Sequence, residues 1–175
     1  SIATLGSYQS TFGGLRDAFL TKIDPAGNVV WSTYFGGSHS DAGNGCSVDD
    51  SMNVYVCGIT LSDSNIATSG TYLSNITVPG NSSSFLVKFD SLGFRKWGTY
   101  YGYNLITLED CQVDNKGHIY ITGQTGDDTL IATNGSHQDT RVNVNDALLA
   151  KFNDLGQLEW GTYYGGNDDD RSYFV

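Results

Sequence analysis

Four short blocks recur along this chain in one order and at nearly one spacing. The block WSTYFGG at residues 31–37 returns as WGTYYGY at 97–103 and as WGTYYGG at 160–166. Repetition at a fixed period indicates an array of similar structural units, and here the period is roughly 65 residues. We therefore divide the chain into copies at 1–65, 66–130 and 131–175, the last one incomplete. The other recurring blocks begin with IAT at residues 2, 66 and 131, with DAFL, SSFL and DALL at 17, 83 and 146, and with SVDD and QVDN at 47 and 112.

Each copy contains four strand-like runs, which in the first copy are 18–24, 29–35, 46–49 and 54–60. In the second run Trp31, Thr33 and Phe35 fall on one face, as strand alternation requires. Short turns that open with Asp or Asn and contain Gly join the runs in pairs. No segment has a helical period over ten residues. A four-stranded antiparallel unit repeated in tandem predicts an all-β fold, namely part of a β-propeller with blades of about 65 residues.

The lengths of the connections give the two ends of such an array different characters. The short turns share one end of the strands, and the long polar connections share the other end, named here the long-loop face. These connections are 36–44, 61–83, 102–110, 124–145 and 166 onward. Long loops in compact domains commonly carry function. The repeated Ile-Ala-Thr block inside them predicts a segment that docks at a fixed place.

A closed propeller has about four to eight blades, more than this chain supplies. We expect the missing blades to come from the remainder of a longer chain or from sister subunits. An open stack of repeats is a third arrangement.

Charge excludes several classes of partner. The chain has 9 Lys and Arg against 19 Asp and Glu, a net charge of −10. This sign argues against binding to nucleic acid or to an anionic membrane surface. No apolar run approaches the roughly 20 residues of a membrane helix, so we expect no membrane insertion.

The segment DAFLTKIDPAGNVVWSTYFGGSHSDAGNGCSVDDSMNVYVCGIT at residues 17–60 resembles the SBBP repeat, which is named for seven-bladed β-propellers. The resemblance extends over the whole chain in nearly three copies. It implies a large secreted or surface-attached protein, often from Bacteroidota that use type IX secretion. It also implies an extracellular or outer-surface location and a binding or adhesion scaffold, with no catalytic residue.

Candidate ligand-binding residues are the acidic and aromatic side chains that we place on the long-loop face. A cluster of loop carboxylates also suits Ca²⁺, although the spaced pattern of a calcium loop is absent, and solvated turn residues are the alternative. We predict no other cofactor. The ligand candidates are Asp41, Asp63, Tyr72, Tyr103, Asp127, Asp128, Asp170 and Tyr173, and the weak calcium candidates are Asp168, Asp169 and Asp170.

Catalytic signals are missing. There is no Gly-x-Ser-x-Gly nucleophile motif, and the three histidines lie on different connections. Glu109 and Asp110 are neighbours on a predicted strand, so they would point to opposite faces. The recurring tryptophans fall inside strands, where packing of one blade on the next accounts for them. We therefore predict that the protein is not an enzyme.

Two modifications follow from local patterns. Counting outward from the turn at 50–53 places Cys46 opposite Cys57, which allows a disulfide; two free thiols are the alternative. Ser51, Ser91 and Thr129 fit the Asp-Ser/Thr-apolar pattern of O-glycosylation in Bacteroidota, if the resemblance holds.

Together these features predict an extracellular scaffold that binds a glycan, a protein or a surface through its long-loop face. A structural spacer or filament subunit is the first alternative. A non-catalytic part of a secreted hydrolase is the second.

Overall fold

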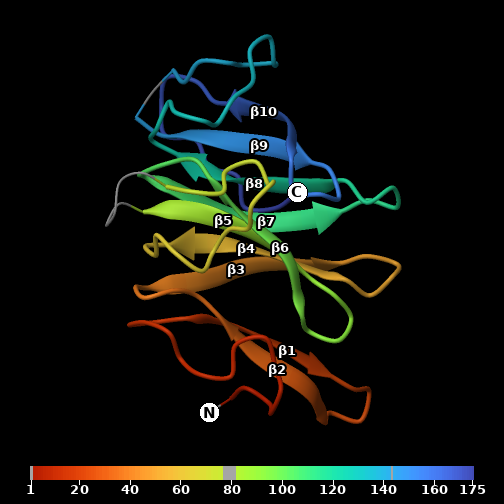
Figure 1. Ribbon diagram of the computed structural model, residues 1–175. Coiled ribbons are helices and arrows are strands. Elements are labelled where there is room, and N and C mark those ends of the chain that lie inside the picture. The colour runs from red at the N-terminus through yellow and green to blue at the C-terminus, as the bar shows by residue number, and fades with distance from the viewer. Residues whose placement is uncertain (1, 77–81, 143) are drawn as a thin grey trace.

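A computed structural model describes residues 2–76, 82–142 and 144–175, and the described residues form strands, turns and loops without a helix. Three antiparallel sheets follow one another along the chain (Figure 1). A two-stranded sheet pairs β1 with β2, a middle sheet has the order β3-β4-β5-β6, and a third sheet has the order β7-β8-β9-β10. The strands are β1 Ala18–Ile23, β2 Val29–Phe35, β3 Asp41–Val48, β4 Val54–Thr60, β5 Ser83–Phe89, β6 Arg95–Tyr101, β7 Ile106–Val113, β8 Ile119–Thr125, β9 Asp146–Phe152 and β10 Leu158–Tyr164.

The four-stranded sheets are offset by half a copy from the sequence repeat. The middle sheet takes β3 and β4 from the first copy and β5 and β6 from the second. The long connection joins the paired strands β4 and β5, which are in register from Val54↔Phe89 to Thr60↔Ser83. The connection between β2 and β3 spans only residues 36–40, shorter than the predicted 36–44, and leads instead to a new sheet. The four runs of one copy therefore do not form one sheet, contrary to the sequence-based expectation.

The first strand of each full sheet begins earlier than predicted. The run at 46–49 is the end of β3, which starts at Asp41 and includes the glycine-rich stretch DAGNG. Low β-propensity hides such a stretch from a sequence reading. A bulge lies between Gly43 and Gly45, and Asn44 Nδ2 donates a 2.8 Å hydrogen bond to the carbonyl of Leu108 in β7. The first strands thus meet across two sheets, as innermost strands of a propeller do.

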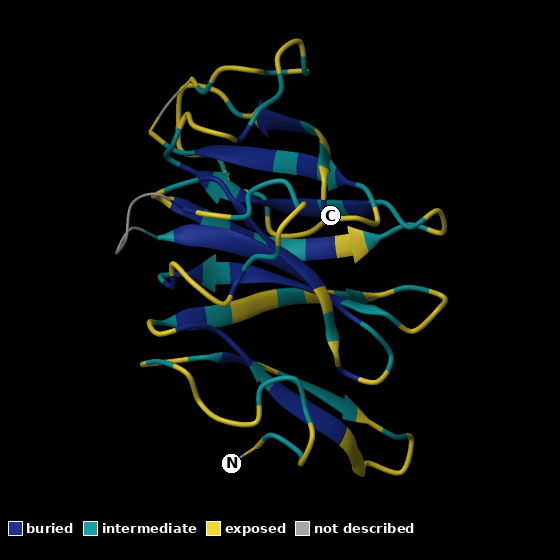
Figure 2. Ribbon diagram, viewed as in Figure 1, coloured by how far each residue is buried: buried dark blue, intermediate teal, exposed yellow. Residues whose placement is uncertain are grey.

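Strand β5 of the middle sheet is buried along its whole length, whereas the edge strand β3 is partly exposed (Figure 2). Strand alternation sends Tyr55, Cys57 and Leu86 into a cluster with the third sheet. It sends Val56, Phe85 and Val87 into a second cluster with β1 and β2. Each such side chain contributes roughly 1.5–3 kcal/mol by burial, so packing between sheets holds the array together.

Each of the first two repeated tryptophans donates an indole hydrogen bond to the next sheet. Trp31 Nε1 donates to the carbonyl of Ser91 at 3.1 Å, and Trp97 Nε1 donates to that of Asp154 at 2.8 Å. These carbonyls lie in the short turns that follow β5 and β9. Gly93 (φ +85°) and Gly156 (φ +74°) hold those turns against the indole rings, where a Cβ would approach within 3 Å. The prediction that these tryptophans pack between units is confirmed.

The Ile-Ala-Thr segments dock on the last strand of each sheet, as predicted. The backbone N–H groups of Thr4, Thr68 and Thr133 donate 2.9 Å hydrogen bonds to the carbonyls of Ser32, Gly98 and Gly161. The long loops therefore return along the outer edge, whose open backbone groups they satisfy. Only part of their length remains at the long-loop face.

Candidate functional site

A cavity of about 320 Å³ opens beside the connection from β2 to β3. It lies where the β1-β2 sheet meets the loop that follows β4. Its lining is polar but uncharged: Tyr8, Gln9, Thr11, Gly13, Gly36, Gly37, Ser38 and Asn65. The three glycines expose backbone to the cavity.

A hydrogen-bond network holds this lining in place. Gln9 Nε2 donates to Asp17 Oδ2 at 2.5 Å, and Gln9 Oε1 accepts from Gly36 N at 3.1 Å. Asp17 also accepts from Gly13 N at 2.8 Å. Burial raises the pKa of Tyr8 against the opposing effect of the Arg95 guanidinium, which lies over its ring. Tyr8 is therefore neutral at physiological pH.

Asp41 lies under the cavity rather than on its surface. It is 1% exposed and accepts hydrogen bonds from Thr60 Oγ1, from Ser62 Oγ at 2.9 Å and from Gly37 N at 2.8 Å. Its carboxylate is fully engaged, so the expectation that Asp41 contacts a ligand directly is corrected. The start of β3 places it there, and it orders the loop from the inside.

Tyr72 also differs from its predicted role. Its ring packs on Tyr101 and Phe152 at centroid distances of 6.1 and 6.0 Å, between the middle and third sheets. Its hydroxyl donates to the carbonyl of Leu130 at 3.3 Å. Tyr72 therefore packs between the middle and the third sheet.

The remaining candidates are spread over the long-loop face and do not converge on one place. Asp63 and Tyr173 are exposed, while Tyr103 is half-buried against the cluster around Phe85. Asp127 Oδ1 accepts from Thr129 N at 3.0 Å, and Asp128 pairs with Arg141 at 2.8 Å.

The three carboxylates at 168–170 do not form the predicted calcium cluster. Within the described ranges, no group of three or more His, Cys, Asp or Glu side chains has a metal-binding arrangement. Asp168 and Asp169 are exposed, whereas Asp170 is half-buried and accepts from Gly166 N at 2.7 Å. Successive residues of this extended segment do not share one direction.

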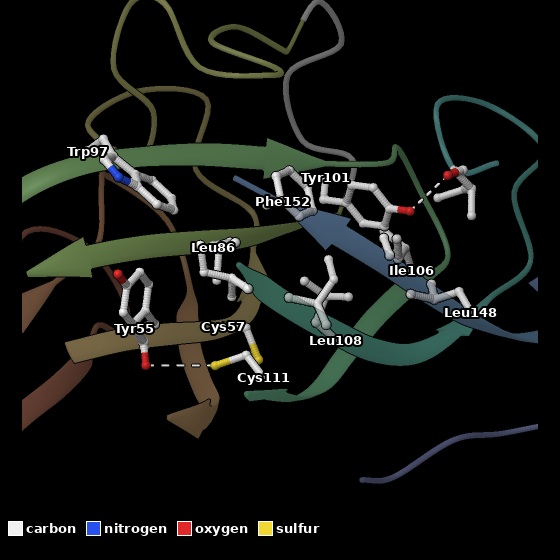
Figure 3. Packing of buried hydrophobic residues seen from close by; sticks show 14 of the residues in the cluster. Tyr55, Cys57, Leu86, Trp97, Tyr101, Ile106, Leu108, Cys111, Leu148 and Phe152 are labelled. Atoms are coloured by element: carbon white, nitrogen blue, oxygen red, sulfur yellow. Dashed lines mark hydrogen bonds between the residues drawn. The ribbon is translucent and has the colours of Figure 1, made fainter. Parts of the chain in front are cut away.

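The predicted pairing of Cys46 with Cys57 is wrong. Beside the turn it is Val48, and not Asp49, that pairs with Val54, so Cys46 lies opposite Val56 and Gly45 lies opposite Cys57. Cys46 is exposed and Cys57 is buried, so they face opposite sides of the sheet. Cys57 instead lies beside Cys111 of β7, and these two form the buried cysteine pair (Figure 3). Contact with Cys57 and burial raise the pKa of the Cys111 thiol.

A second polar cavity, of about 260 Å³, lies at the end with the short turns. Sequence reasoning missed it because its residues come from three different turns and one strand. Lys88, 9% exposed in its side chain, pairs with Asp154 of the next sheet and lies 5.2 Å from the centroid of the Tyr55 ring. The Tyr55 hydroxyl donates to Asp154 at 3.0 Å. Burial, followed by this hydrogen bond, raises the pKa of Tyr55 far above its usual value.

Sequence reasoning also missed Gln9 and Asp17 and their counterparts Gln138 and Asp146. Their signal is visible in the repeats. Copies one and three share three polar positions, whereas copy two has Leu73, Ser83 and Ile106 in their place. The shared residues are a Gln (Gln9 and Gln138), an Asp at the start of the first run (Asp17 and Asp146) and an Asp after Gly-Gly (Asp41 and Asp170). Three positions that change together indicate one polar cluster.

Antiparallel four-stranded sheets packed face to face, with recurring tryptophans between them, give this chain the architecture of part of a β-propeller. Residues 30–66 match the family model SBBP, described as a beta-propeller repeat. The chain is also 28% identical over 154 residues to the "Uncharacterized WD repeat-containing protein L264" of Acanthamoeba polyphaga mimivirus. That match covers 82% of this chain and 11% of the relative. The bacterial origin, the secretion route and a seven-bladed ring stay predictions.

Among the described residues, no helix is long and apolar enough to cross a membrane.

Proposed function

We propose that this chain is a non-catalytic binding scaffold that holds a protein partner on its long-loop face. The observation that carries this proposal is the cavity beside the β2-β3 connection. Its walls are preformed, because Gln9, Asp17 and Asp41 bind the surrounding backbone. A preformed site avoids the entropy cost of ordering loops when a partner binds.

The chemistry of the lining favours binding over catalysis. Thr11, Ser38 and Asn65 offer hydroxyl and amide groups, and Gly13 and Gly37 allow a ligand to approach the backbone closely. None of the lining residues is a carboxylate, an imidazole or a thiol, so the cavity has no pair for acid–base or nucleophilic chemistry. Neutral hydrogen-bonding groups suit a peptide loop, and they also suit the hydroxyls of a glycan.

The similarity to β-propeller and WD repeat proteins supports a scaffold that binds proteins. We further propose that the protein works outside the cell or on its outer surface, as an adhesion protein or a part of one. Ser51 and Thr129 are exposed, as glycosylated residues must be. Ser91 is half-buried, and its carbonyl accepts from Trp31, so it is the weakest of the three candidates.

The test begins with a random peptide display library and a glycan array, both probed with the 175-residue chain. Binders are then measured against Ser38→Trp and Asn65→Trp, which fill the cavity. Asp50→Trp is the matched control, because Asp50 is exposed beside the cavity at the short-turn end.

We expect enriched peptides whose affinity falls at least tenfold with either cavity variant and stays unchanged with Asp50→Trp. Loss with Asp50→Trp alone would move the site to the short-turn end. Enrichment of glycans alone would replace the protein partner by a sugar. No binder of either kind would favour the structural spacer, and turnover seen only with a longer chain would favour the hydrolase part.

A further inference from the structure

Two carboxylates face each other at the long-loop end of β9. Asp146 is the first residue of β9, and Asp170 follows β10. A Cβ placed on Gly165 would lie 2.9 Å from Asp146 Oδ1 and 2.8 Å from Asp170 Oδ2. These contacts are too short for a real Cβ, so the two carboxylates crowd the Gly165 backbone and lie close to each other.

Among the described residues, nothing compensates the charge of this acidic pair. Asp146 is fully buried, and its Oδ1 has no hydrogen-bond donor within the described part of the chain. Its Oδ2 accepts from Gln138 Nε2 and Val142 N, both at 3.0 Å. The ion pairs found among the described residues do not include Asp146 or Asp170. A buried, unpaired carboxylate is costly, and a second carboxylate beside it increases the cost.

The first copy shows how the protein satisfies the same pair when it uses its own donors. There a Cβ on Gly36 would lie 3.0 Å from Asp17 Oδ1 and 2.6 Å from Asp41 Oδ2. Asp41 receives two hydroxyls, from Thr60 and Ser62, in addition to Gly37 N. Among the described residues, the Asp170 side chain accepts only the corresponding backbone bond, from Gly166 N. The third copy therefore has the acidic pair without the hydroxyl donors.

We propose that Asp146 and Asp170 bind a calcium ion beside Gly165. Calcium accepts six to eight oxygen ligands in flexible geometry, and carboxylates and water are among its usual ligands. Asp146 Oδ1 and the Asp170 carboxylate supply the charged ligands, and water completes the shell on the half-exposed side of Asp170. Two carboxylates correspond to a weak site, with a Kd on the order of 10⁻⁴–10⁻³ M.

The test is calorimetric titration of CaCl₂ into the chelator-treated chain, together with thermal unfolding in EDTA and in 10 mM CaCl₂. We expect one calcium per chain and a rise in Tm of about 3–6 °C at 10 mM. Asp146→Asn and Asp170→Asn should each abolish both signals. Asp128→Asn and Asp168→Asn remove exposed carboxylates from the same face and should keep both signals.

A pair of glycine variants tests where the ion binds. Gly165→Ala places a methyl group between the two oxygens and should abolish calcium binding. Gly166→Ala has nothing within 4 Å of its new Cβ and should leave binding unchanged. The proposal is overturned if calcium produces neither heat nor a Tm shift in the wild type. It is equally overturned if Asp146→Asn raises Tm in EDTA while calcium leaves the Tm of the wild type unchanged. A proton shared between Asp146 and Asp170, and not a calcium ion, would then neutralise the pair.

Discussion

Replacing Asp41 by Ala tests whether a single buried carboxylate orders the loop under the candidate binding cavity. The Asp41 side chain accepts from Gly37 N, Thr60 Oγ1 and Ser62 Oγ, and all four residues are buried. The Gly37 N–H is held by the backbone, so it becomes a buried donor without an acceptor, at a cost of about 1–3 kcal/mol.

The two hydroxyls lose a charged acceptor, which is worth about 1.5–3 kcal/mol for each bond. Part of this loss is recovered, because hydroxyls rotate and Thr60 Oγ1 already lies 3.4 Å from the carbonyl of Ser62. We expect Asp41→Ala to lower the free energy of unfolding by about 3–5 kcal/mol in total.

The assay is urea unfolding of the 175-residue chain followed by tryptophan fluorescence in EDTA. Asp170→Ala is the matched control, since Asp170 occupies the equivalent position, is half-buried and, within the described ranges, accepts only from Gly166 N. We expect the control to lose less than about 1 kcal/mol. If Asp41→Ala loses no more than the control, the carboxylate does not organise the loop and our account of the cavity fails.

Three further predictions concern packing, thiols and pH. Gly93→Ala should destabilise the fold by roughly 1 kcal/mol more than Gly27→Ala in urea unfolding. The two glycines share a φ near +85°, but only a Cβ at Gly93 meets the Trp31 ring. Equal losses would refute the packing of this turn against the Trp31 indole. Cys46 should react with a thiol reagent within seconds to minutes in the native protein, and the buried cysteine pair should react only in urea; fast reaction of three thiols would contradict the packing between sheets. Burial, aided by nearby carboxylates such as that of Asp128, raises the pKa of Tyr163 to about 12. The unfolded state then loses its phenol proton first, so stability present below pH 10 should fall as the pH rises towards 12. Urea unfolding between pH 10 and pH 12 should show this loss of stability in the wild type and a smaller loss in Tyr163→Phe, and equal losses would refute the assignment.

The repeats alone predicted the all-β class, the strand runs, the tryptophan packing and the docking of the Ile-Ala-Thr segments. These features depend on local alternation, turn chemistry and period, which are written in the order of residues. The Trp31 block, for example, recurs inside a strand, and only packing between units requires a large side chain at that place each time.

The tertiary structure decided which strands share a sheet and what each polar residue faces. The pairing of Val48 with Val54 beside the turn placed Cys46 opposite Val56, and packing between sheets brought Cys57 beside Cys111. The start of β3 placed Asp41 in the interior beneath the β2-β3 connection, and packing between sheets placed the Tyr72 ring against Tyr101. Register shifts and contacts between sheets couple residues about 60 positions apart, so a local pattern does not contain them. The sequence therefore determined the elements of this protein, and packing between sheets determined which of its carboxylates, thiols and aromatic rings are free to act.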